Sequence, residues 1–176
     1  EEFNQDYLNH LEEVIQYEGP KTIAAILIES VTGTNGILIP PAGYMQGVRE
    51  ICDRYGIVMI CDEVMSGFGR TGRWFAVNHW NVTPDIMTMA KGLTSGYAPL
   101  GAVAMRQEIA DTFKDHAYEG GLTYNGHPLS LAAAIATIGV MQQDGPVARS
   151  AQLGQVMAEL LAELTDRHPS MGAARS

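Results

Sequence analysis

Residues 57–61 read IVMIC, an unbroken apolar run that ends directly at Asp62. A second run of the same kind, TIAAILI, occupies residues 22–28. Short apolar runs without alternation are typical of strands covered on both faces, as in parallel sheets. Residues 44–55 lie between the two runs and have a helical pattern that Gly56 ends. A strand, a helix and a strand in this order predict parallel strands with a right-handed crossover, and hence an α/β fold.

The rest of the chain adds two further strands and three helices to this unit. An amphipathic helix is predicted over 4–18, before the first strand. Short apolar runs at 86–89 and 101–105 predict a third and a fourth strand, separated by a glycine-rich stretch. Prolines at first-turn positions open predicted helices over 128–143 and 146–168. The sequence has no repeat and no low-complexity linker, so we expect no internal domain boundary.

The composition is that of a globular chain with an apolar core, because 46% of its 176 residues are hydrophobic. The formal net charge of -9 repels phosphate backbones, so we expect no nucleic-acid partner. No apolar run approaches the roughly 18 residues of a membrane span, and the N-terminus has no signal pattern. Cys52 and Cys61 lie in apolar stretches and are expected to be buried, reduced thiols. We therefore expect a cytoplasmic protein without a membrane segment.

Asp62 and Lys91 each follow a predicted strand directly. The loops at the carboxyl ends of parallel strands form the ligand crevice of such sheets, so adjacent strands would bring this carboxylate and this amine to one edge. A desolvated lysine amine can form an imine with an aldehyde, and a carboxylate can hold a ring nitrogen in its cationic form. Pyridoxal phosphate requires these two protein groups. A structural ion pair is the alternative, and the spacing alone does not decide between them.

The segment GGLTYNGHP at 120–128 supplies amide and hydroxyl donors before a predicted helix N-terminus, as a cofactor phosphate requires. Thr123 is the best candidate hydroxyl in this segment. An ordinary turn and N-cap cluster is the alternative interpretation.

A competing motif, GFGRTG at 67–72, fits the G-x-G-x-x-G pattern of dinucleotide sites. No amphipathic helix follows it, and Asp85 comes too soon to be the acidic residue of that fingerprint. The five histidines have no metal-ligand spacing, so we expect no metal site. A dinucleotide-binding module remains an alternative of a different class.

Three strings in one order resemble the class III, omega-type aminotransferases of fold type I: DEVMSGFGRTG at 62–72, TPDIMTMAKGLTSGYAPLGAV at 83–103, and GLTYNGHP at 121–128. The resemblance covers nearly the whole chain and implies the large domain of a fold type I enzyme, a mostly parallel sheet flanked by helices. It also implies pyridoxal 5'-phosphate as cofactor. Lys91 would form the imine and move protons, and Asp62 would partner the pyridine nitrogen.

The resemblance assigns two further residues and a partner. Val64 would pack on one face of the cofactor ring. Thr123 would bind the phosphate, and in this family that threonine reaches the cofactor of the other subunit. A homodimer with composite sites is thus implied.

Two departures narrow the subclass. Many members have Gln where this chain has Met65, so the contact of that Gln with the phenolic oxygen must be absent or supplied otherwise. Ornithine- and GABA-type members have a gating Glu where this chain has Thr34. The chain looks most like taurine-, β-alanine-pyruvate and related ω-amino-acid aminotransferases.

Family members are much longer, and this chain lacks an initiator Met. Residues 1–176 are therefore expected to be the central and C-terminal part of the large domain, without the N-terminal segment and the small C-terminal domain. The expected reaction moves an amino group from an ω-amino acid or amine to a keto acid such as pyruvate. An aminomutase of the glutamate-1-semialdehyde kind is the nearest alternative, because it shares the Lys and the Asp.

Overall fold

The computed structural model describes residues 2–172 and 174–176, with side chains from residue 5 onward. Its strands and helices follow the predicted order, with one additional short helix, α3. In chain order the elements are α1 (Glu2–Glu18), η1 (Pro20–Thr22), β1 (Ala25–Glu29), α2 (Tyr44–Tyr55), β2 (Val58–Asp62), η2 (Ala76–His79), β3 (Ile86–Met89), η3 (Lys91–Leu93), β4 (Ala102–Met105), α3 (Gln107–Asp111), α4 (Pro128–Gln143) and α5 (Pro146–Arg167), where η marks a 3-10 turn.

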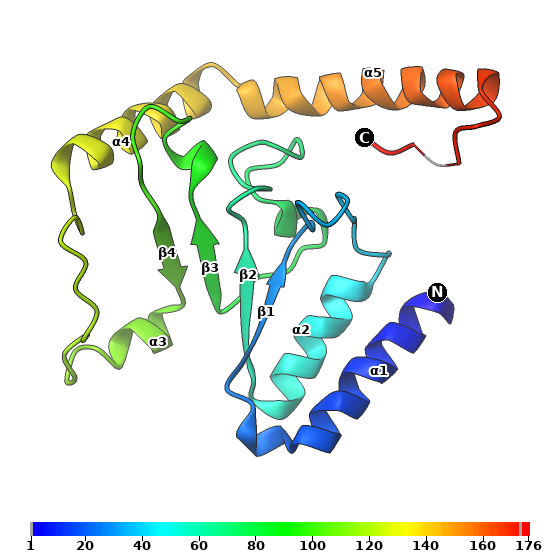
Figure 1. Cartoon of the computed structure of the whole chain (residues 1–176). Coiled ribbons are helices and arrows are strands. Elements are labelled where there is room, and N and C mark those ends of the chain that lie inside the picture. Colours follow the sequence, from blue (N-terminus) through cyan, green and yellow to red (C-terminus); the bar gives the residue numbers. More distant parts are fainter. Residues whose placement is uncertain (1, 173) are drawn as a thin grey trace.

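The four strands form one sheet in the order β1-β2-β3-β4. β1, β2 and β3 run parallel, and β4 pairs antiparallel with β3. The prediction of an α/β fold with a mostly parallel sheet is therefore confirmed. Figure 1 shows the ends of β1, β2 and β3 at one edge of the sheet, below α4 and α5.

The core lies between the sheet and the helix pair α1 and α2. Val48 and Cys52 of α2 pack with Met59 of β2, and all three side chains have no exposed surface. α1 joins this core closely because Gly47 of α2 has no side chain: a Cβ there would lie 2.2 Å from Cδ1 of Leu8. Gly56 ends α2 in the left-handed conformation, with φ of 67°.

One prediction about the sheet is wrong for this chain. The apolar runs predicted strands covered on both faces, but the side chains of β1 alternate in burial and Leu27 is 67% exposed. Val103 of β4 lies on the same face and is 58% exposed. α1 and α2 cover the other face, where Met59 and Cys61 are buried. The apolar run predicts burial on both faces, but in this chain one layer of helices covers only one face of the sheet. The apolar side chains of the other face therefore remain exposed.

β1 also begins later than the predicted residue 22. Pro20–Thr22 forms a 3-10 turn, and the hydroxyl of Thr22 donates to the carbonyl oxygens of Glu18 and Gly19 at 2.8 Å each. A threonine hydroxyl that bonds to the carbonyls of the preceding turn favours the turn over pairing with a neighbouring strand.

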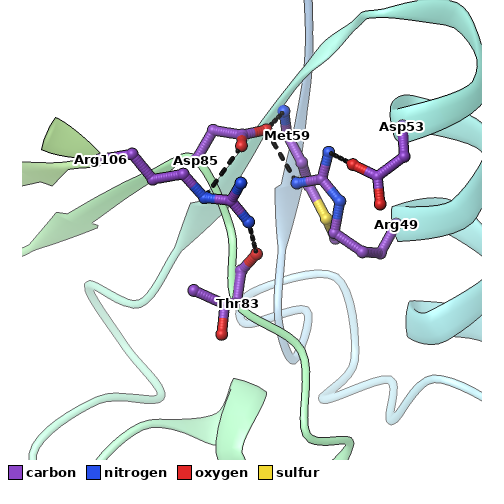
Figure 2. A network of polar contacts seen from close by, with 6 residues as sticks. All are labelled: Arg49, Asp53, Met59, Thr83, Asp85 and Arg106. Carbon is purple, nitrogen blue, oxygen red and sulfur yellow. Dashed lines mark hydrogen bonds and ion pairs between the residues drawn. The ribbon is translucent and has the colours of Figure 1, made fainter. Parts of the chain in front are cut away.

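Figure 2 shows an ionic network around Asp85. Asp85 comes directly before β3, whereas Thr88, the partner of Asp62, lies near the other end of that strand. Asp85, just before β3, accepts hydrogen bonds from the amide of Met59 at 2.7 Å and from Arg49 at 2.8 Å. Nε of Arg106, just after β4, lies 3.2 Å from the same carboxylate. Burial acts to raise the pKa of Asp85, but the hydrogen bond from Met59 and the two guanidinium groups outweigh it and lower that pKa. The network therefore joins α2, β2 and β4 to the start of β3.

The two cysteines are free and buried, as predicted. Burial raises the pKa of Cys52 to about 11 and that of Cys61 to about 12. Both thiols are therefore protonated and unreactive near neutral pH. Among the described residues we find no helix with the length and apolar character that crossing a bilayer requires.

Candidate active site

Asp62 and Lys91 lie at the same edge of the sheet, as their positions in the sequence predict. Asp62 is the last residue of β2, and its partner on the neighbouring parallel strand β3 is Thr88. Lys91 follows Thr88 by three residues and begins η3. The carboxylate and the amine therefore belong to adjacent strand ends.

The Asp62 carboxylate is held in place by its own loop. Its Oδ1 accepts a hydrogen bond from the amide of Val64 at 2.8 Å, and this bond closes a tight turn after β2. Among the described residues, Oδ2 takes part in no hydrogen bond or ion pair. One oxygen of this half-buried carboxylate is thus free for a ligand.

Lys91 has an unusual backbone conformation and an exposed side chain. Its φ is +39°, in the left-handed region that non-glycine residues seldom occupy and that is often found at functional sites. Within the part of the chain that the structure describes, no carboxylate oxygen lies within 4.0 Å of its ammonium. The alternative of a structural ion pair between Asp62 and Lys91 is therefore wrong for this structure.

Phe68 contacts the residue that follows Lys91. A Cβ at Gly92 would lie 2.7 Å from the Cβ of Phe68, so the two backbones approach closely. Phe68 is itself held with φ of +56°, and its amide donates to the carbonyl of Trp74 at 2.6 Å. Its ring packs edge-on against Phe75, with ring centroids 5.4 Å apart. The loop after β2 thus braces the loop that carries Lys91.

Glu63 is a functional candidate that the sequence analysis missed. Its side chain is fully buried, and its carboxylate accepts hydrogen bonds from Ser66 Oγ at 2.7 Å and from the amides of Ala76 and Val77 at 3.0 and 2.9 Å. These contacts tie the loop after β2 to the start of η2. The sequence shows only that an acidic residue follows Asp62. It does not show whether that carboxylate is buried in the fold or faces a ligand.

Met65 packs against the turn that follows β1. A Cβ at Gly33 would lie 2.8 Å from the sulfur of Met65 and 3.3 Å from Glu29. Glu29, the partner of Asp62 across β1 and β2, accepts a hydrogen bond from the Gly33 amide at 2.7 Å. Met65 therefore holds two loops together with an apolar side chain.

The glycines of GFGRTG serve close packing. The segment forms turns, with no helix beginning in it, and both Gly69 and Gly72 have positive φ. A Cβ at Gly69 would lie 3.2 Å from Val147, and one at Gly72 would lie 2.9 Å from Ala151. Because α5 occupies the space beside these glycines, the geometry of a dinucleotide phosphate loop is absent from this segment.

The edge formed by Asp62 and Lys91 can hold an aldehyde and a cationic ring nitrogen together. Among the described residues, the exposed Lys91 amine has no ion pair and the Asp62 carboxylate keeps one oxygen without a hydrogen bond. These properties fit the two protein groups that pyridoxal phosphate requires. Two hollows of the described chain lie away from this edge, one beside the C-terminal half of α5 and one beside Tyr17 and Tyr55.

Comparison with known families decides the assignment, because the model of the class-III aminotransferases matches residues 1–176. This chain belongs to the class-III aminotransferases. Solved structures agree with the family: the chain superposes with a TM-score of 0.95 and 48% identity on a taurine:2-oxoglutarate aminotransferase from Bifidobacterium kashiwanohense in complex with PLP and glutamate, over 98% of this chain and 39% of that one.

Sequence relatives carry related names. The chain is 40% identical over 171 residues to the taurine-pyruvate aminotransferase of Bilophila wadsworthia, which covers 94% of this chain and 38% of the relative. It is 40% identical over 152 residues to the β-alanine-pyruvate aminotransferase of Pseudomonas aeruginosa, covering 82% of this chain and 34% of the relative. This class-III aminotransferase chain thus spans a little over a third of the length of the curated relatives that it matches.

Thr123 lies apart from the other candidates of this class-III chain. It belongs to the segment between α3 and α4, which Figure 1 shows at the outer side of β4. The residue is exposed, and α4 begins at Pro128 without a side-chain cap, so Thr123 is not an N-cap. It has no hydrogen bond to Asp62 or Lys91 in the described part of the chain. Four exposed apolar side chains flank this segment: Leu122 (78%), Tyr124 (77%), Leu129 (70%) and Ile135 (73%).

Proposed function

We propose that this chain is the central and C-terminal part of the large domain of a longer pyridoxal-phosphate-dependent aminotransferase. The reaction moves an amino group from an ω-amino acid or amine to a keto acid such as pyruvate. One observation supports the proposal most: Lys91 and Asp62 stand at the ends of adjacent strands, and among the described residues the Lys91 amine has no ion pair and Asp62 Oδ2 has no hydrogen bond.

Lys91 and Asp62 have different roles in this proposal. The Lys91 amine would hold the cofactor through its aldehyde, and the same amine, once a donor amine has replaced it, would accept and return a proton. Asp62 would hold the ring nitrogen in its cationic form through its free oxygen, and the Val64 amide fixes the other oxygen. The cofactor would supply an electron sink when it is bound. Val64 would line the ring's binding surface.

The experiment that tests the function is an absorbance spectrum of the full-length protein with added pyridoxal phosphate. The wild type should show a new band that borohydride fixes onto Lys91, and Lys91→Ala should lose it. Lys21→Ala is the matched control, because Lys21 is an exposed lysine in η1, far along the chain from the site. Absence of the band in the wild type would contradict the proposal.

Turnover distinguishes transfer from an aminomutase reaction. The relatives named above are aminotransferases, which favours transfer. An aminotransferase requires both a donor and a keto acid, so the product should form from an ω-amino donor only when pyruvate or 2-oxoglutarate is added. Product from a single amino-aldehyde substrate without a keto acid would favour the aminomutase.

The same proposal includes a homodimer in which Thr123 binds the cofactor phosphate of the partner subunit. The exposed position of Thr123 and the apolar side chains around it support this arrangement, because large exposed apolar patches mark interfaces. Light scattering should give the mass of a dimer. A mixture of Lys91→Ala and Thr123→Val subunits should regain cofactor attachment, because each hybrid dimer has one site with both native residues. No recovery in the mixture would count against composite sites.

The reduced, buried thiols support a cytoplasmic location.

A further inference from the structure

Thr88 carries a polar group that the structure leaves without a partner. Its hydroxyl oxygen is inaccessible to solvent and has no hydrogen bond to any residue that the structure describes. An unsatisfied buried hydroxyl is unfavourable, and native proteins keep few of them. Its backbone is engaged, because the Thr88 carbonyl accepts from the amide of Glu63 at 2.9 Å. The hydroxyl is therefore held at a fixed place without a structural contact that explains it.

The residue directly across from Thr88 on β2 is Asp62. Thr88 and Asp62 are direct partners across β2 and β3, so their side chains point to the same face at the same edge. Neighbouring strands are about 4.8 Å apart, a distance that a threonine hydroxyl and an aspartate side chain can bridge together. Because the hydroxyl is inaccessible to solvent, a ligand that binds at the open edge reaches Asp62 and not Thr88.

We propose that Thr88 is a positioning residue for Asp62, whose hydroxyl donates to the Asp62 carboxylate when that carboxylate holds the ring nitrogen of the cofactor. The inference rests on the proposed function. Oδ1 of Asp62 is occupied by the Val64 amide, and Oδ2 has the capacity to accept both the ring N–H and the threonine hydroxyl. Two fixed donors, one from the loop and one from β3, orient the carboxylate from opposite sides.

The test compares Thr88→Val and Thr88→Ser in the full-length protein. Valine keeps the branched shape of threonine and removes the hydroxyl, whereas serine keeps the hydroxyl. Thr88→Val should bind pyridoxal phosphate about ten- to a hundredfold more weakly, as the loss of one hydrogen bond to a charged group implies. The pH midpoint of the cofactor absorbance should also move in this variant, and Thr88→Ser should match the wild type in both measurements.

The melting temperature of the cofactor-free protein separates this role from a structural one. Thr88→Val should melt at or above the wild-type temperature, because the hydroxyl has no partner in the fold. A clear fall in that temperature, with unchanged cofactor affinity, would assign the hydroxyl to the fold and overturn the inference.

A double-mutant cycle tests whether Thr88 acts through Asp62. In an Asp62→Asn background, Thr88→Val should cause no further loss of affinity, because the contact is already altered. An additive loss would mean that Thr88 acts independently of Asp62 and would overturn the inference. If neither the wild type nor Thr88→Ser binds the cofactor, the proposed function itself fails. If both bind it and Thr88→Val binds equally well, only the role of Thr88 fails.

Discussion

Gly92 has no side chain because Phe68 occupies the space where a Cβ would stand. The gap between that position and the Cβ of Phe68 is 2.7 Å, well inside the contact distance of two carbon atoms. Phe68 cannot move freely, since its amide and its ring are both engaged. At the scale of single residues, we infer that the contact between Phe68 and Gly92 helps to hold Lys91 at its positive φ.

We predict that Gly92→Ala weakens covalent attachment of pyridoxal phosphate about tenfold. Overpacking costs about 1–3 kcal/mol, and relief of the clash must move either Phe68 or the Lys91 backbone. Gly101→Ala is the control, because a Cβ there meets only the carbonyl of Met89, at 3.7 Å. Affinity is measured by titration of the cofactor absorbance. Equal affinity in the two variants would show that Lys91 does not depend on this contact.

Glu63 joins two elements through a carboxylate that water does not reach. Three donors satisfy it, and two of them are amides at the start of η2. A glutamine side chain has one acceptor oxygen and brings an NH2 group toward the same donors. The tether is therefore specific for a carboxylate.

We predict that Glu63→Gln lowers the free energy of unfolding by about 2–3 kcal/mol, because buried donors lose a charged acceptor. Glu50→Gln, on the exposed side of α2, should change it by less than about 0.5 kcal/mol. Urea unfolding followed by circular dichroism measures both. A near-neutral Glu63→Gln would mean that the loop finds other acceptors.

α5 packs against the loop after β2 through glycines. Gly72 is the closest contact, 2.9 Å from Ala151 when a Cβ is added, and its φ is +80°. Both the space and the backbone conformation therefore require glycine at this position. Gly154, in α5 itself, has open space around it.

The two glycines should respond to alanine in opposite directions. Gly72→Ala should destabilise the protein by about 1–3 kcal/mol through overpacking and backbone strain. Gly154→Ala should stabilise it by up to about 1 kcal/mol, because alanine favours a helix interior and a Cβ there meets open space. Melting temperatures of the two variants decide this, and a shift of the same sign in both would contradict the packing of α5 on the loop.

At the scale of the whole molecule, the ionic network and the candidate site residues lie at opposite ends of the strands. The Asp85 network holds the end where β3 starts and β4 finishes, and Asp62 and Lys91 lie at the other. The folded state lowers the pKa of Asp85, so this carboxylate stabilises the fold when it is ionised. Its contribution is complete above the unfolded pKa of about 3.9 and is lost as the pH falls through the lower, folded value.

We predict that Asp85→Asn is less stable than the wild type near pH 7 and that the difference narrows as the pH falls below about 4. Asp53→Asn serves as the control, because Asp53 pairs with the same Arg49 but is 61% exposed. Asp53→Asn should lower the free energy of unfolding by less than Asp85→Asn does. Urea unfolding between acid and neutral pH measures the difference, and a pH-independent loss would assign the effect to shape rather than charge.

The sequence by itself determined the main helices and strands, apart from the short α3 and the start of β1, together with their order and the two strand ends that carry Asp62 and Lys91. Periodicity and helix stops are local properties, and parallel pairing follows from the helix between two apolar runs. Tertiary structure alone decided which sheet face is covered, that Glu63 is a buried tether, and that Thr88 lies beside Asp62 with a free hydroxyl. It also assigned the GFGRTG glycines to packing on α5. These features depend on contacts between residues far apart in the chain. Local sequence patterns do not predict such contacts.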